Sequence, residues 1–220
     1  MGMMIELTAS DGHVLDAYVA GDPGAASSVV IIQEIFGVNG HIRSVVDRYA
    51  EMGHLAIAPA MFDRAQRDLD LEYTPEGMTE GKAVQANVPW DTTTVDTGAA
   101  VEHVRRGQPV AVVGYCFGGG VAWRAANELD IDAAVGYYGG QIVHDLDRPP
   151  KCPIMLHFGA DDPMIPPENI EAIGAAFPAV PIHVYEDAGH GFNCDVRGSY
   201  SPEASALAQE RTNAFLASNL

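Results

Sequence analysis

The sequence predicts an α/β fold in which a mostly parallel central sheet is covered by helices on both faces. Residues 29–32 and 110–113 are continuous runs of Val, Ile and Ala. Such runs, unlike alternating ones, are typical of strands buried on both faces of a parallel sheet. Strand-like and helix-like segments then alternate along the chain, which is the order that builds such a sheet. The length of 220 residues fits one domain, residues 1–220, better than two.

The individual elements follow from local patterns. Alternating segments at 5–8 and 14–19 flank Asp11-Gly12, a pair typical of an antiparallel hairpin. A helix at 41–52 can end at Gly53, and a helix at 167–177 begins with Pro, which a first turn tolerates. Residues 63–89 are the least regular, and we expect a long loop or a cap with one short helix. The other patterns predict helices at 92–106, 117–127 and 202–215, and strands at 55–58, 133–138, 154–158 and 182–185.

Composition and charge exclude several classes of function. The formal net charge is −18, from 12 Lys+Arg and 30 Asp+Glu. Nucleic-acid binding requires a basic face, and a field of this sign also repels anionic membranes. We find no secretory signal and no apolar run that approaches the roughly 20 residues of a membrane span, so we expect a cytoplasmic protein. The three cysteines, Cys116, Cys152 and Cys194, match no zinc motif, and we expect no metal.

The strongest motif is Gly114-Tyr115-Cys116-Phe117-Gly118, which lies between a predicted buried strand and a predicted helix. This is the nucleophile-elbow pattern of the α/β-hydrolase fold, with Cys in place of Ser. The turn is so sharp that side chains at the flanking positions would clash, which is why they are glycines. The N-terminus of the following helix favours a thiolate. The competing interpretation is a buried structural cysteine in a glycine-rich turn.

A cysteine nucleophile needs a base and a group that orients the base. In this fold the acid and the histidine follow the nucleophile in that order. Asp161 and Asp162 come just after the strand at 154–158, and His190 comes just after the strand at 182–185. Both loops lie at the carboxyl ends of strands, where such sheets bind ligands. The residues leave Asp161, Asp162 and Asp187 open as the acid, and His190 as a surface residue is the competing interpretation.

Glu34 follows a buried strand directly, where a charge is costly unless it has a partner. It is either functional or a structural carboxylate that bonds a neighbouring loop. The same loop normally supplies one oxyanion N–H, and the residue after the nucleophile supplies the other. We therefore predict the N–H groups of Ile35 and Phe117 as the oxyanion hole. Tyr115, Phe36 and Trp90 are candidates to line the substrate pocket, with core packing as the alternative.

Five motifs together resemble the dienelactone hydrolase family, also called carboxymethylenebutenolidases. They occur in the family's order and spread over most of the chain: Gln-Glu-Ile-Phe-Gly-Val-Asn at 33–39, Gly-Tyr-Cys-Phe-Gly-Gly at 114–119, Ala-Val-Gly-Tyr-Tyr-Gly at 134–139, Gly-Ala-Asp-Asp-Pro at 159–163 and Ala-Gly-His-Gly-Phe at 188–192.

The resemblance implies an activity and a set of roles. Cys116 matches the family's nucleophile, His190 its base and Asp162, rather than Asp161, its orienting acid. Glu34 matches a glutamate thought to help deprotonate the cysteine when substrate binds. The family opens an unsaturated lactone that carries a carboxylate, in the degradation of chlorinated aromatics. It needs no cofactor and is commonly monomeric, so we expect a monomer that acts on a small ester or lactone.

The chain departs from the family where the substrate carboxylate is held. The family uses arginines there, one of them at the position of Cys194 in this sequence. No arginine lies between residues 73 and 90, where only Lys82 is basic, and Arg197 is the remaining candidate cation. With a net charge of −18, the loss of these arginines would weaken the binding of an anionic lactone. We therefore expect a neutral or differently charged ester or lactone at least as readily as the carboxylated one.

Alternatives remain open at this stage. Cysteine, histidine and aspartate also serve thioester hydrolysis, acyl transfer and peptidase chemistry. A non-catalytic hydrolase-like protein would lack a member of the set, and a redox sensor would carry a reactive thiol without esterase turnover. Cys194 is either a passive small residue or a partner that oxidation links to Cys116.

Overall fold

An eight-stranded sheet forms the centre of the computed structural model, which describes residues 2–220. The strand order is β1-β2-β4-β3-β5-β6-β7-β8. Strands β1 (Met3–Thr8) and β2 (Val14–Ala20) form the predicted hairpin, and β2 pairs antiparallel with β4 (Leu55–Pro59). All other neighbours are parallel: β3 (Ser28–Ile32), β5 (Val110–Tyr115), β6 (Ala133–Tyr137), β7 (Ile154–Gly159) and β8 (Ile182–Tyr185).

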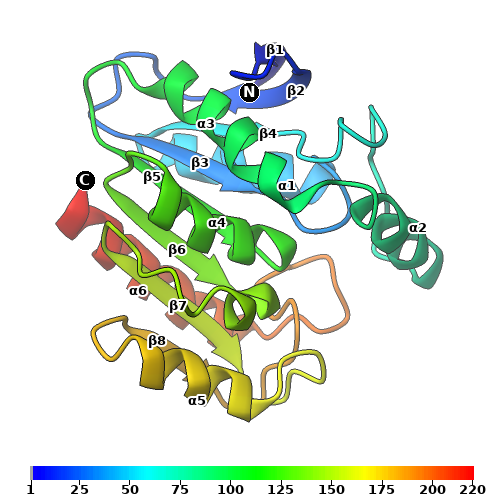
Figure 1. Ribbon diagram of the computed structural model, residues 1–220, viewed down its shortest axis with the longest axis vertical. Helices are drawn as coiled ribbons and strands as arrows, with labels where there is room; N and C mark the ends of the chain where they lie inside the picture. The colour runs from blue at the N-terminus through cyan, green and yellow to red at the C-terminus, as the bar shows by residue number, and fades with distance from the viewer. Residues whose placement is uncertain (1) are drawn as a thin grey trace.

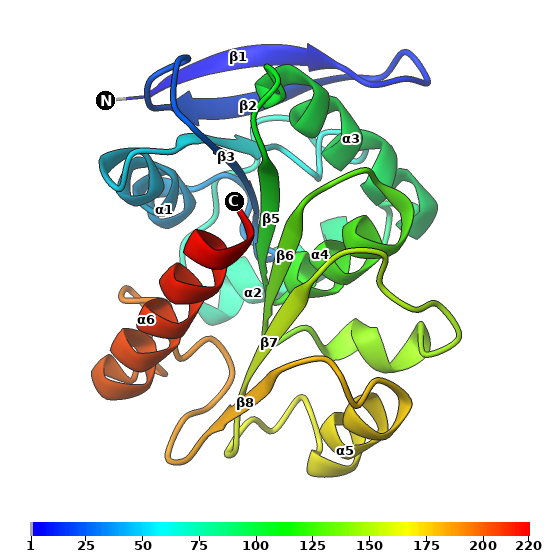
Figure 2. The same ribbon diagram turned by 90° about the vertical axis from the view of Figure 1, so that its left-hand side faces the viewer.

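Helices cover both faces of the sheet, as the edge-on view in Figure 2 shows. One face carries α1 (Gly40–Glu51) and α6 (Pro202–Asn219). The other carries α3 (Thr93–Val104), α4 (Phe117–Glu128) and α5 (Pro167–Ala176). Because both faces are covered, the central strands are buried along their whole length, as their apolar sequences require. The α/β-hydrolase fold predicted from the sequence is thus confirmed.

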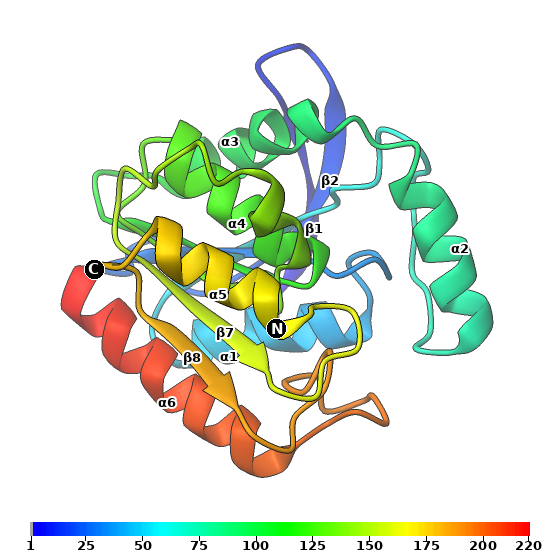
Figure 3. The same ribbon diagram turned by 60° about the horizontal axis from the view of Figure 1, so that its bottom comes forward.

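The irregular stretch at 63–89, expected as a long loop or a cap with one short helix, contains the helix α2 (Pro75–Gln85). Thr74 caps it, accepting a hydrogen bond from the Gly77 N–H, and Pro75 starts its first turn. The helix stands at the side of the molecule toward which the central parallel strands point (Figures 1 and 3). Two short 3₁₀ turns, η1 (Trp90–Thr92) and η2 (Gly140–His144), flank α4.

Within residues 2–220, no helix is both long enough and apolar enough to cross a bilayer. The same described residues contain no group of three or more His, Cys, Asp or Glu side chains placed to hold a metal ion.

Candidate active site

Cys116 lies in the sharp turn between β5 and α4, where the sequence predicts it. Its backbone has φ 55° and ψ −112°, a strained conformation for a residue other than glycine. The strain persists because the turn is held from outside: the Cys116 N–H donates to the Tyr137 carbonyl at 3.0 Å. A side chain at Gly114 would run into the carbonyl of Gly118, so only glycine permits this approach of strand to helix. The turn leaves the thiol at the carboxyl edge of the sheet.

Two loops from the same edge bring a histidine and an aspartate to this thiol. His190 follows β8, and its Nε2 lies 3.1 Å from the Sγ of Cys116. Asp162 follows β7, and its Oδ2 lies 2.7 Å from Nδ1 of the same imidazole. The second oxygen of Asp162 accepts the N–H of Met164 at 2.8 Å, which fixes the carboxylate. Asp161 is exposed, so of these two neighbours the structure brings only Asp162 to the histidine. Asp187 is likewise exposed.

The electrostatic environment of His190 favours the imidazolium. Burial lowers the pKa of His190, but the negative charge of a Cys116 thiolate and the hydrogen bond to Asp162 outweigh it. The net result is a pKa raised to about 10. An imidazole in this setting can accept a proton and hold it beside the Cys116 sulfur.

Tyr138 is a neighbour of His190 that the sequence did not single out. It follows β6 with φ 40°, uncommon for a bulky residue, and its ring lies 5.1 Å from the imidazole. Its N–H donates to the carbonyl of His157 at 2.7 Å. The end of β6 therefore holds both Cys116, through its backbone, and His190, through a ring contact.

Glu34 is buried and forms an ion pair with Arg197. Its side chain is 1% exposed, and Nη1 of Arg197 lies 2.9 Å from Oε1. The guanidinium lies 5.7 Å from the ring centres of both Phe36 and Tyr73, which pack on each other 4.3 Å apart, so it rests against an aromatic pair. Within residues 2–220, the other oxygen, Oε2, has no hydrogen-bond partner. Arg197 thus reaches back from the histidine loop to the loop after β3.

Two backbone N–H groups beside Cys116 are free. Neither the N–H of Phe117 nor that of Ile35 has an acceptor in the part of the chain that the structure describes. The Gly118 N–H donates to the carbonyl of Gln33 at 3.1 Å, and the Gln33 amide oxygen accepts the N–H of Met61. These bonds tie the loop after β3 to the first turn of α4, so the two free groups belong to one rigid unit.

A small pocket, with a volume of about 20 Å³, opens beside Cys116 and His190. Its lining includes three of the predicted pocket residues, Phe36, Lys82 and Arg197, and the complete lining is Ile35, Phe36, Met78, Lys82, Cys116, Met164, His190 and Arg197. A larger apolar groove lies between α5 and β8, but neither Cys116 nor His190 lines it.

Helix α2 contributes Met78 and Lys82 to this cavity. Gly81 lies directly against the carbonyl of Ile35, where any side chain would collide. No sequence signal singles out Met78, although it stands one helical turn before Lys82 and so shares its face. Met164, in the aspartate loop, was also missed, because an apolar loop residue carries no signal of its own.

Two of the residues predicted to line the pocket, Tyr115 and Trp90, are absent from its lining. Tyr115 is fully buried and stacks on Tyr137 with 4.9 Å between ring centres, because it still belongs to the core-facing end of β5. Trp90 is absent from the cavity lining and packs against Phe117 instead, with 5.5 Å between ring centres. Tyr115 thus lies in the core, and the partly buried Trp90 packs against it. Cys194 is a buried free thiol whose pKa is raised to about 12, first by burial and then by Glu34.

Comparisons with known proteins show similarity to the dienelactone hydrolases. A model of the dienelactone hydrolase family matches residues 15–220. The carboxymethylenebutenolidase of Pseudomonas putida is 34% identical over 229 aligned residues, covering 97% of this chain and 95% of that protein. A solved Klebsiella pneumoniae structure assigned as a dienelactone hydrolase is 28% identical, with a TM-score of 0.84 and 99% coverage of both chains. A dienelactone hydrolase-like promiscuous phosphotriesterase from metagenomic libraries, 21% identical with a TM-score of 0.79 and coverage of 99% and 98%, shares the fold.

Proposed function

Because the chain belongs to the dienelactone hydrolase family and is therefore a hydrolase of ester or lactone bonds, we propose that it cleaves a lactone or small ester through a cysteine acyl-enzyme. The observation that carries the proposal is the hydrogen-bonded chain from Cys116 through His190 to Asp162. In it Cys116 is the nucleophile, His190 the base and Asp162 the group that orients the imidazole.

Acylation begins when the thiolate of Cys116 attacks the carbonyl carbon. A carbon–sulfur bond forms, and the carbonyl electron pair moves to oxygen as an oxyanion. When the oxyanion collapses, the carbon–oxygen bond of the ester breaks, and the leaving oxygen takes the proton held on His190. The product of this half is a thioester on Cys116 and, for a lactone, an opened ring still attached to the protein.

Deacylation reverses the proton flow. The neutral imidazole of His190 removes a proton from water, and the hydroxide oxygen attacks the thioester carbon. The carbon–sulfur bond breaks, the acid product leaves, and the thiolate and the imidazolium are restored. The N–H groups of Phe117 and Ile35 are proposed to hold the oxyanion in both halves, and loss of one such donor typically costs about 3–4 kcal/mol.

Glu34 is proposed to help remove the proton from the Cys116 thiol before acylation, as in the family. A buried carboxylate with one oxygen held by Arg197 and the other free can accept a proton at the free oxygen. The ion pair also has a second effect. It neutralises the charge of Arg197, which leaves Lys82 as the cation of the cavity lining without a carboxylate partner among the described residues.

The substrate class follows from this charge balance. Beside Lys82, the lining is mainly the apolar side chains of Ile35, Phe36, Met78 and Met164. The protein as a whole carries a net charge of −18. We therefore propose that a neutral small ester or lactone is turned over at least as well as a carboxylated one, because one exposed lysine attracts a carboxylate only weakly.

The test measures hydrolysis of p-nitrophenyl acetate and of a carboxylated dienelactone by the native protein and by Cys116→Ala. We expect the variant to lose activity on both substrates. Cys152→Ala is the matched control. Cys152 is a half-buried thiol that precedes the first residue of β7, at the end of that strand away from Cys116. Full activity in Cys116→Ala would exclude the acyl-enzyme, and a large advantage of the carboxylated substrate would exclude the proposed substrate class.

A further inference from the structure

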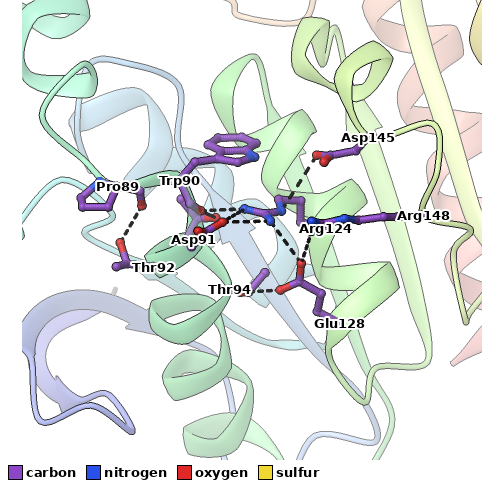
Figure 4. Close-up of polar contacts among 10 residues, drawn as sticks. Pro89, Trp90, Asp91, Thr92, Thr94, Arg124, Glu128, Asp145 and Arg148 are labelled. Carbon is purple, nitrogen blue, oxygen red and sulfur yellow. Dashed lines mark hydrogen bonds and ion pairs between the residues drawn. The ribbon is translucent and has the colours of Figure 1, made fainter.

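Arg124 is a buried arginine outside the site described so far. It lies on α4, two helical turns beyond Phe117, and is only 4% exposed. Burial of a guanidinium is costly unless charged and polar partners surround it. Figure 4 shows that such partners converge on it from η1, from α4 itself and from the residue after η2.

The contacts of Arg124 tie η1 to α4. Its Nη1 donates to the carbonyl of Trp90 at 3.0 Å, and both terminal nitrogens lie 3.2 Å from Oδ1 of Asp91. Glu128, one turn along the helix, lies 3.3 Å away, and Asp145 lies 3.9 Å from Nε. The Asp91 side chain is 94% exposed, whereas the Asp145 side chain is only 14% exposed.

Trp90 passes this anchoring on to the first turn of α4. The Arg124 guanidinium lies 5.6 Å from the centre of the indole, which also contacts Phe117 and lies close to Gly120. The indole meets the Phe117 ring edge-on, with 5.5 Å between centres. A Cβ placed on Gly120 would lie 3.2 Å from the indole, so ring and helix are in close contact. Phe62 packs on Phe117 as well, with ring centres 5.1 Å apart.

These contacts form a closed circuit, that is, a chain of contacts that starts and ends on α4. Arg124 on α4 binds Trp90, and Trp90 packs against residues 117 and 120 of the same helix. We propose that Arg124 is a positioning residue that, through Trp90, fixes the N–H of Phe117 where the oxyanion forms. This inference rests on the proposed function, in which Phe117 supplies that N–H. It goes beyond it by assigning a role to a cluster that has no contact with substrate.

The circuit predicts a particular kinetic signature. An N–H that acts on the oxyanion is used only in the transition state, so its displacement lowers kcat and leaves KM unchanged. Misplacement of such a group by about 1 Å can cost about 100-fold in rate. For Arg124→Met, which keeps much of the side-chain volume but no donor, we expect kcat on p-nitrophenyl acetate to fall by about 10- to 100-fold.

Two further variants separate positioning from stability. Arg124→Lys keeps the charge beside Glu128 and Asp145, and so supports folding, but it loses the paired hydrogen bonds to η1. We expect a lowered kcat here too. Arg148→Met is the matched control, because Arg148 belongs to the same cluster but is 47% exposed and, among the described residues, forms an ion pair with Glu128 alone. Its kcat is expected to equal that of the native protein.

A double-mutant cycle with Trp90→Leu decides whether the effect passes through Trp90. If it does, the kcat of the Arg124→Met, Trp90→Leu double variant equals that of the worse single variant. Active-site titration of each variant gives the concentration of competent sites used to calculate kcat. A thermal melt shows that the variant is folded. Native kcat in folded Arg124→Lys, or multiplicative losses in the double variant, overturns the inference. Failure of the proposed function would appear separately, as native esterase activity in Cys116→Ala.

Discussion

Two buried histidines show how partners, rather than burial, decide what an imidazole does. His157 on β7 and His190 after β8 are 0% and 9% exposed. Each has both ring nitrogens in hydrogen bonds. His157 contacts the hydroxyls of Tyr185 and Thr212 at 2.8 and 3.0 Å, whereas His190 contacts an aspartate and a thiol at 2.7 and 3.1 Å. Yet the pKa of His157 is lowered to about 3, and that of His190 is raised to about 10.

The difference lies in the charge of the partners. Burial lowers the pKa of both rings. Nothing opposes burial at His157, whose hydroxyl partners are neutral and whose charged neighbours, His183 and Arg211, lower the pKa further. At His190 the anionic partners reverse the shift. The first ring therefore links strands and α6 as a neutral hydrogen-bonding group, and the second can store a proton.

The largest expected effect comes from removing the anionic partner that orients His190. Asp162→Asn keeps the shape of the side chain, but its amide donates to Nδ1 and so selects the wrong tautomer. We expect kcat on p-nitrophenyl acetate to fall by about 10⁴-fold. Asp161→Asn is the control, because that side chain is exposed, and it should retain native activity. Comparable losses in both variants would show that the aspartate loop, and not the carboxylate of Asp162, matters.

A smaller effect is expected on the titration of His190 itself. The Cys116 thiolate is the largest influence that raises the pKa of His190, so Cys116→Ala should lower that pKa well below about 10. The pKa of His190 is measured by following its imidazole resonances by NMR from about pH 5 to 11, a range that includes the ordinary histidine pKa of about 6.5. His157 serves as the internal control and should stay neutral throughout. A pKa of about 10 in the variant would contradict the role given to sulfur.

The smallest effect concerns stability in acid. Because the pKa of His157 is lowered from 6.5 to about 3, unfolding lets it take up a proton between these values. Its contribution to the free energy of unfolding is therefore fully present above pH 6.5 and falls with decreasing pH, by at most about 1.4 kcal/mol per pH unit, until about pH 3.

His157→Gln keeps a donor and an acceptor for the two hydroxyls but does not titrate. We expect it to cost about 1–2 kcal/mol at neutral pH and to lose stability less steeply in acid. Urea unfolding at about pH 7, 5 and 4 measures the free energy of unfolding above the ordinary pKa of histidine and at two points inside the titration window. The slope of this free energy against pH is then compared between the native protein and the variant. Equal slopes in native protein and variant would mean that His157 titrates normally.

The sequence was informative where chain order determines geometry. In a parallel sheet, the loops that follow β5, β7 and β8 end at one edge, so Cys116, Asp162 and His190 were expected to meet there. The choice between Asp161 and Asp162 required the family resemblance, because two neighbours in one loop differ only in side-chain direction. The hairpin and the parallel core followed from pattern alone, whereas the pattern of 63–89 left a long loop and a cap with one short helix equally open.

The sequence was uninformative where side chains meet across the fold. Nothing in the local sequence links Glu34 to Arg197, or Arg124 to Trp90, because each pair joins elements far apart in the chain. Tyr115 shows a related difficulty. It is adjacent to Cys116, but successive residues leave a strand in different directions, so the neighbour of a nucleophile can belong to the core.

The contact of Gly81 with the Ile35 carbonyl has a consequence for protein engineering. Glycine within a helix costs about 1 kcal/mol relative to alanine, so α2 gives up intrinsic helicity to lie against the loop after β3. Libraries that vary α2 to change substrate preference should therefore randomise Met78 and Lys82 while keeping Gly81 fixed. A helix transplanted from another enzyme would need a glycine at the same place, or it would push the graft away from the reaction centre.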